Sequence, residues 1–92
     1  MADIDFRRRH ALPLKDAKAR VERIAEHIAG RFDLDYGWRG NTLAFSRSGV
    51  EGEITVTAKE VHVLVRLGFL LFALRPAIER EIERTFVEQF ET

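Results

Sequence analysis

The chain contains no cysteine, two prolines, and one residue each of tryptophan, tyrosine and methionine. Without cysteine, the chain has no disulfide framework, no CxxC redox motif and no thiolate zinc ligand. The absence also fits a reducing compartment, and the N-terminal MADIDFRRRH lacks the apolar stretch of a secretory signal. We therefore expect a cytoplasmic protein.

An excess of charge of one sign is also missing. Fifteen basic residues balance fifteen acidic ones, so no global field would draw the chain onto nucleic acid or anionic lipid. The densest basic cluster is Arg7, Arg8, Arg9 and His10, and strand alternation divides it between two faces. We interpret it as charged protection of an edge strand and expect no nucleic-acid partner.

Long apolar runs and catalytic motifs are absent as well. The longest apolar run, residues 69–74, would span roughly 9 Å as a helix against roughly 30 Å of bilayer core, so no transmembrane segment is expected. The chain has no G-x-S-x-G elbow, no glycine-rich phosphate loop and no HExxH. His10, His27 and His62 fall in different predicted elements. We expect no enzyme activity, no cofactor and no metal site.

Hydrophobic residues make up 46% of the 92 residues, enough for one core, and we expect a single domain over 1–92. Alternation predicts a strand near 3–10, and Pro13 followed by an apolar stripe at spacings of three and four predicts a helix over 13–30 that Gly30 ends. From Phe32 the period changes to two, which predicts four strands up to Leu67. Turns are expected at Gly40-Asn41 and Ser48-Gly49. A second amphipathic helix follows Pro76 and extends to about residue 90.

One face of the predicted strands is apolar and needs a cover, which the two helices can supply. The face is formed by Tyr36, Trp38, Phe45, Ile54, Val56, Val63 and Val65. The predicted fold is α+β, with an antiparallel curved sheet, the order β-α-β-β-β-β-α, and both helices packed on one face.

Six consecutive apolar residues, Phe69 to Leu74, precede Pro76. Helix residues lie about 100° apart, so this run points in every direction and one sheet cannot cover it. Pro76 kinks the helix or restarts it, and Gly68 is a weak N-cap. Two interpretations follow. Either the run plugs an open end of the sheet, or part of it forms an exposed apolar patch that binds a partner. The candidate contact residues are Phe69, Leu70, Phe72 and Leu74.

Several stretches resemble a known family. They are LPLKDAKARVERIA at 12–25, RSGVEG at 47–52 and RLGFLLFALRPAIEREIE at 66–83. The chain resembles, over nearly its whole length, the small bacterial polyhydroxyalkanoic acid system proteins, also described as polyhydroxyalkanoate granule-region proteins. The resemblance implies a role in bacterial storage-polyester metabolism, with the granule surface or a granule protein as partner. It supplies no catalytic residues.

Three hypotheses remain at this point. The first is a non-enzymatic accessory or regulatory protein that contacts polyester granules through the apolar run. The second follows from the order of elements, which resembles a reduced helix-grip domain: a hydroxyacyl or fatty acyl ligand would lie between helix and sheet, lined by Tyr36, Trp38 and Phe86. In the third, the apolar run is the interface of a homodimer.

Overall fold

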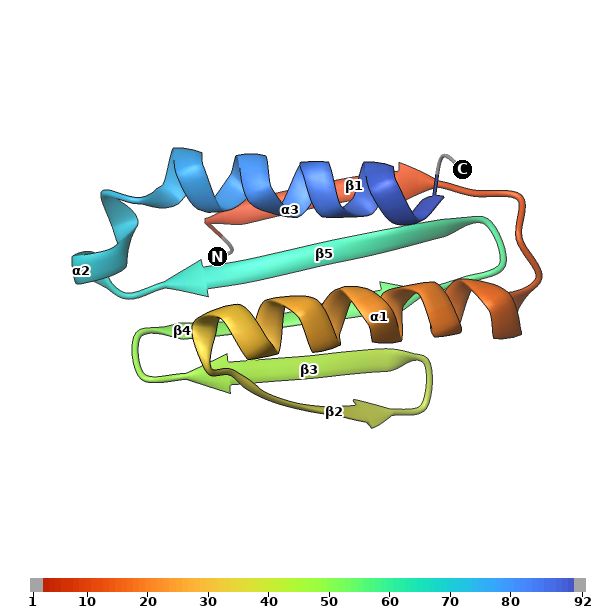
Figure 1. Ribbon diagram of the computed structural model, residues 1–92, viewed down its shortest axis with the longest axis horizontal. Helices are drawn as coiled ribbons and strands as arrows, with labels where there is room; N and C mark the ends of the chain where they lie inside the picture. Colours follow the sequence, from red (N-terminus) through yellow and green to blue (C-terminus); the bar gives the residue numbers. More distant parts are fainter. Residues whose placement is uncertain (1–2, 91–92) are drawn as a thin grey trace.

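The computed structural model describes residues 3–90 (Figure 1). Within them lie five strands and three helices. The elements are β1 (Ile4–Arg9), α1 (Leu14–Phe32), β2 (Asp35–Arg39), β3 (Thr42–Arg47), β4 (Val50–Val56), β5 (Glu60–Leu67), α2 (Phe69–Phe72) and α3 (Arg75–Phe90). The predicted order of elements is confirmed, and the short helix α2 is an addition between the last strand and the C-terminal helix.

The strands form one antiparallel sheet in the order β1-β5-β4-β3-β2. The first and last strands of the chain therefore pair, which leaves β1 and β2 at the two edges. Helices α1 and α3 lie over the same face of this sheet, α3 along β1 and α1 along β4 and β2 (Figure 1). This is the predicted α+β arrangement, with both helices on one face.

The core follows from the strand register. Pairing places Phe6, Val63, Ile54, Leu43 and Trp38 in one row across all five strands. The three central members of the row are buried, whereas the two on the edge strands are half-buried. Because alternate strand residues face the same side, this row and its neighbours form the apolar face that the helices cover. Burial is therefore complete at mid-sheet and partial at both edges.

Phe86 attaches α3 to the sheet. Its side chain is fully buried, its ring centroid lies 5.5 Å from that of Phe6 on β1, and it stacks on Phe90 one turn later at 5.9 Å. Tilted and offset ring pairs at such distances are the favoured aromatic geometries. The second half of α3 is therefore held tightly over the β1 edge.

Both predicted hairpin turns are present, each with a glycine in the left-handed region. Gly40 has φ 63° between β2 and β3, and Gly49 has φ 87° between β3 and β4. Residues with a Cβ atom rarely adopt this conformation, so glycine suits each of these tight connections.

The predicted end of the first helix is wrong. Helix α1 begins at Leu14, with Pro13 at its N-cap, but it continues past Gly30 to Phe32 and ends at Asp33, which has φ 58°. A glycine inside a helix costs about 1 kcal/mol relative to alanine, and packing of the helix on the sheet outweighs that cost. Phe32 is therefore the last residue of α1 and not the first of a strand, and β2 begins at Asp35.

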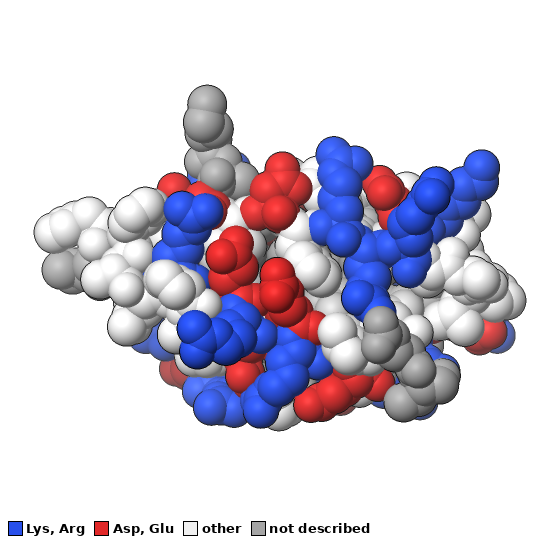
Figure 2. All heavy atoms as spheres, turned by 90° about the horizontal axis from the view of Figure 1, so that it is seen from above, with Lys and Arg blue, Asp and Glu red and all other residues white. Residues whose placement is uncertain are grey.

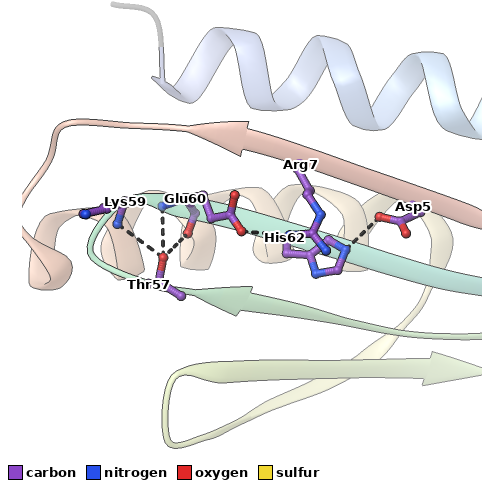
Figure 3. A network of polar contacts seen from close by, with 6 residues as sticks. All are labelled: Asp5, Arg7, Thr57, Lys59, Glu60 and His62. Carbon is purple, nitrogen blue, oxygen red and sulfur yellow. Dashed lines mark hydrogen bonds and ion pairs between the residues drawn. The ribbon is translucent and has the colours of Figure 1, made fainter.

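The opposite face of the sheet is open and polar. Near the β1 edge, Arg7 donates to Glu60 at 3.1 Å, and the Nε2 atom of His62 lies 2.7 Å from Asp5 Oδ1 (Figure 3). Both pairs link β1 to β5. Exposed ion pairs contribute about 0–1 kcal/mol each, so their main effect is a hydrated, charged surface beside the edge strand.

Gly52 has no room for a side chain. A Cβ atom there would lie 2.5 Å from Phe45 Cζ and 2.6 Å from the backbone oxygen of Leu64. We expect Gly52→Ala to destabilise the fold by about 1–3 kcal/mol, because the aromatic ring and strand β5 must both shift. Thermal unfolding should show a melting temperature lower by roughly 5 °C or more. Gly37→Ala is the matched control, since nothing lies within 4 Å of its added Cβ. Equal melting temperatures for the two variants would contradict this packing.

Candidate functional site

An apolar surface projects at the end of the molecule where α2 lies. Its side chains are exposed by 87% at Phe69, 47% at Phe72 and 53% at Leu74. We call these three residues the apolar tip. Figure 2 shows this end, at the left of the view, without charged groups, whereas charged side chains cover the middle of the same face. The side chain of Leu70, the fourth predicted contact residue, lies outside the described part of the chain.

The chain breaks the apolar run into separately oriented parts. Gly68 is the N-cap of α2, and its carbonyl accepts the backbone N–H groups of Leu71 and Phe72, both at 3.0 Å. Helix α3 then starts at Arg75, with Pro76 in its first turn. Pro76 lacks the N–H that a continuous helix would direct at the Phe72 carbonyl. Of the two predicted outcomes at this proline, a kink or a restart, the chain adopts the restart.

Two contacts hold α2 against the turn between β3 and β4. The Gly68 N–H donates to the Gly49 carbonyl at 2.8 Å. The Leu71 side chain covers the same turn, because a Cβ atom added at Gly49 would lie 3.3 Å from Leu71 Cδ1. Among the described side chains of α2, Leu71 is therefore the one that faces inward, whereas the residues of the apolar tip are exposed.

Behind the tip lies a cavity of about 370 Å³ between the two long helices and the sheet. Its buried walls come from the sheet and from both helices, and they consist of Ala25, Ile54, Val63, Val65, Ile82 and Phe86. Exposed lining residues mark its mouth beside α2, and they are Phe32, Arg47, Ser48, Gly49 and Leu74. The cavity is therefore apolar inside and opens next to the apolar tip.

Few charged groups line this cavity. Glu81 on α3 binds Arg31 of α1 at 3.1 Å and Arg84 of its own helix at 2.8 Å, so two arginines neutralise its carboxylate. Arg47 donates to the Phe32 carbonyl, and within residues 3–90 it forms no ion pair. Arg47 is therefore the charged residue at the mouth of the cavity that has no ion-pair partner within residues 3–90.

A carboxylate at one side of the cavity orients two aromatic residues. The Tyr36 hydroxyl donates to Glu22 at 2.8 Å, and the indole N–H of Trp38 donates to the other oxygen of the same carboxylate at 2.6 Å. The ammonium of Lys18 lies 4.8 Å from the Trp38 ring centroid. The hydrogen bond to Glu22 raises the pKa of Tyr36 from 10.0 to about 12, with smaller contributions from burial and from the charges of Glu22 and Glu26.

The residues expected to line a ligand pocket do not all meet. Tyr36 and Phe86 both line the cavity, whereas Trp38 is not among the lining residues and is held against α1 by Glu22. Sequence reasoning missed Glu22. The sequence carries part of the signal for this contact. Half-buried tyrosine and tryptophan usually need a hydrogen-bond partner, and Glu22 lies next to Val21, a residue of the apolar stripe that faces the sheet.

Metal-binding clusters and helices able to span a membrane are both absent among the described residues. No group of three or more histidine, aspartate or glutamate side chains in residues 3–90 is arranged to hold a metal ion. None of the helices in this part of the chain has the length and apolar composition needed to cross a bilayer.

We call the two hydrogen bonds from Tyr36 and Trp38 to Glu22 the Glu22 clamp, and titration of Tyr36 tests it. Because the chain has one tyrosine, tyrosinate absorbance reports this residue alone. We expect a midpoint near pH 12, and a shift toward 10.0 in Glu22→Ala, which removes the acceptor. Since the folded pKa is the raised one, the stabilisation by this contact is present below pH 10 and is lost as the pH rises through about 12.

Glu26→Gln is the control for this titration, because Glu26 acts on Tyr36 through its charge alone. It should move the midpoint less than Glu22→Ala does, with circular dichroism verifying the fold at each pH. Equal midpoints for wild type and Glu22→Ala would contradict the clamp.

The comparisons with known proteins give one result. No curated protein and no solved structure matches this chain, so the likeness to helix-grip domains stays a prediction. The family model described as "Putative polyhydroxyalkanoic acid system protein" matches residues 4–90, which is nearly the entire chain. The matched range includes all five strands, the apolar tip and α3, and this chain belongs to the polyhydroxyalkanoic acid system family.

Proposed function

We propose that this chain is a non-enzymatic accessory protein of polyhydroxyalkanoate storage metabolism, cytoplasmic, that attaches to the surface of polyester granules through the apolar tip. The observation that carries the proposal is the exposure of Phe69, Phe72 and Leu74 on one projecting end. Family membership supports the polyester as the partner.

The energetics favour reversible attachment. Burying a leucine or phenylalanine side chain contributes roughly 1.5–3 kcal/mol, so two tip residues contribute about 3–6 kcal/mol. Association costs about 4–15 kcal/mol in lost translational and rotational freedom, which equals or exceeds the gain from two side chains. A single copy therefore binds weakly. Retention on a granule then requires contacts beyond two apolar side chains, which the third tip residue and the border of the tip can supply.

The shape of the tip suits a broad apolar surface. The tip is a projection on a one-turn helix, so it can enter a soft surface without a matching pocket. The guanidinium of Arg75 lies 6.0 Å from the Phe72 ring centroid, at the border of the tip. Arginine N–H groups can donate to the ester carbonyl oxygens of a polyester, which combines an apolar contact with a polar one.

Single charged substitutions in the apolar tip should greatly weaken attachment to granules. We expect wild type to co-sediment with native granules and with particles of purified polyester. Phe69→Asp and Phe72→Asp should lose at least about tenfold in retention, because a carboxylate resists transfer into an apolar surface. Leu14→Asp is the matched control, since Leu14 is also exposed but lies at the start of α1, at the opposite end of the molecule. Circular dichroism should verify the fold of each variant.

Retention of the tip variants at the wild-type level would overturn this proposal. Binding to native granules but not to purified polyester would overturn the polymer as partner and point to a granule protein. Sedimentation velocity tests the homodimer hypothesis, because it measures whether the chain is a monomer or a dimer in solution. A dimer that Phe69→Asp dissociates, with no granule retention by wild type, would assign the tip to self-association instead.

A further inference from the structure

The cavity behind the tip has features that granule attachment does not use. We propose that it binds a medium-chain fatty acid or hydroxy fatty acid, with the aliphatic chain inside the cavity and the carboxylate at Arg47. This proposal requires no granule, and of the three residues of the apolar tip only Leu74 lines the cavity.

The interior of the cavity suits an aliphatic chain. Its buried walls are alanine, valine, isoleucine and phenylalanine side chains from α1, β4, β5 and α3. The only hydroxyl among the half-buried lining residues, that of Tyr36, already donates to Glu22. A polar guest would leave its own hydrogen-bonding groups without partners there, whereas an apolar guest would not.

The shape of the cavity favours a chain over a compact ligand. Its lining includes Leu74, which directly precedes α3, and then Ile78, Ile82 and Phe86 at every fourth position along that helix. At about 1.5 Å per residue, these positions extend over roughly 18 Å. A volume of about 370 Å³ holds roughly a dozen groups of the size of a water molecule. A space of this length and volume fits one aliphatic chain of roughly ten carbons.

Charge at the mouth favours an acid. Arg47 lies at the exposed end of the cavity beside Ser48, and within residues 3–90 it forms no ion pair. The carboxylate of Glu81, also on the lining, is engaged by two arginines. A guanidinium binds a carboxylate through charge-assisted hydrogen bonds, and Arg47 uses one of its N–H groups on the Phe32 carbonyl. The ligand should therefore lie with its head at Arg47 and its tail toward Phe86.

Paired ligands test the tail and the head separately. Calorimetric titration with decanoate below its micellar concentration, and with decanol below its solubility limit, should give saturable binding of one molecule per chain. Arg47→Gln should weaken decanoate binding roughly tenfold or more and leave decanol binding unchanged, because only the acid uses the charge. Arg39→Gln, an exposed arginine at the end of β2, is the matched control and should change neither.

A substitution that fills the cavity should abolish binding of both ligands. Ala29 lines the cavity from α1 and is half-buried, so Ala29→Phe places a ring in the space of the ligand. A second measurement covers the case in which this variant does not fold. In wild type, bound decanoate should show nuclear Overhauser contacts to methyl groups of Ile54, Val63 and Ile82.

Absence of saturable decanoate binding, or equal binding by folded Ala29→Phe, would overturn the proposal. Contacts only to methyl groups outside the cavity would do the same. An equal loss of decanoate and decanol binding in Arg47→Gln would overturn the role of Arg47 as the head-group site. A dimer that blocks decanoate would assign the cavity to a second copy of the chain. Folded Ala29→Phe should still bind granules and Phe69→Asp should still bind decanoate, so the two proposals fail independently.

Discussion

A hydrogen bond from the Gly68 N–H to the Gly49 carbonyl, 2.8 Å long, determines where the apolar run lies. It ties the end of β5 to the turn between β3 and β4, and Leu71 then packs over Gly49. With Leu71 turned inward, the other described apolar side chains of the one-turn helix α2, Phe69 and Phe72, are exposed. The apolar tip and the mouth of the cavity both follow from this anchor.

The anchor also explains why two separate stretches of sequence belong together. The segment RSGVEG supplies Gly49, whose positive φ makes the turn, and Gly52, which leaves room for the Phe45 ring. The segment RLGFLLFALRP supplies Gly68, Leu71 and Pro76. These glycines carry no chemistry of their own. Their role is to let the turn and α2 approach closely, so that the tip has a defined position.

Much of the fold could be predicted from the sequence because it rests on local periodicity. Alternation in β4 and β5, the positive-φ glycines of the β2–β3 and β3–β4 turns, and the apolar stripe of α1 each point to one structure. The end of α1 could not be predicted, because Gly30 is tolerated only through packing against the sheet. The sequence predicts a break in the helix at Pro76. It does not decide between a kink and a restart, because either one relieves the clash of the proline ring with the Phe72 carbonyl.

The site was predictable only in part, because its features depend on distances between elements. The sequence allows two interpretations of the apolar run, a plug at the open end of the sheet or an exposed patch. The contacts of Gly68 and Leu71 with Gly49 decide between them, because they leave Phe69 and Phe72 exposed. The cavity and the Glu22 clamp on Tyr36 and Trp38 depend on the separation of α1 from α3 and from β2, which no single segment encodes. The likeness to helix-grip domains and strand alternation together predict Trp38 as a pocket residue, whereas the structure holds it against α1 by its hydrogen bond to Glu22, outside the lining of the cavity.

The central claim is that the end of the molecule carrying α2 enters an apolar surface while the opposite end stays in water. The chain has no cysteine, so one polarity-sensitive dye can be attached at a single introduced thiol. Ala73→Cys places the dye beside the tip, and Ala11→Cys places it on the exposed connection before α1. On addition of polyester granules, the account predicts a blue shift of the dye emission at position 73 and none at position 11. Equal shifts at both positions, or no shift at position 73, would contradict it.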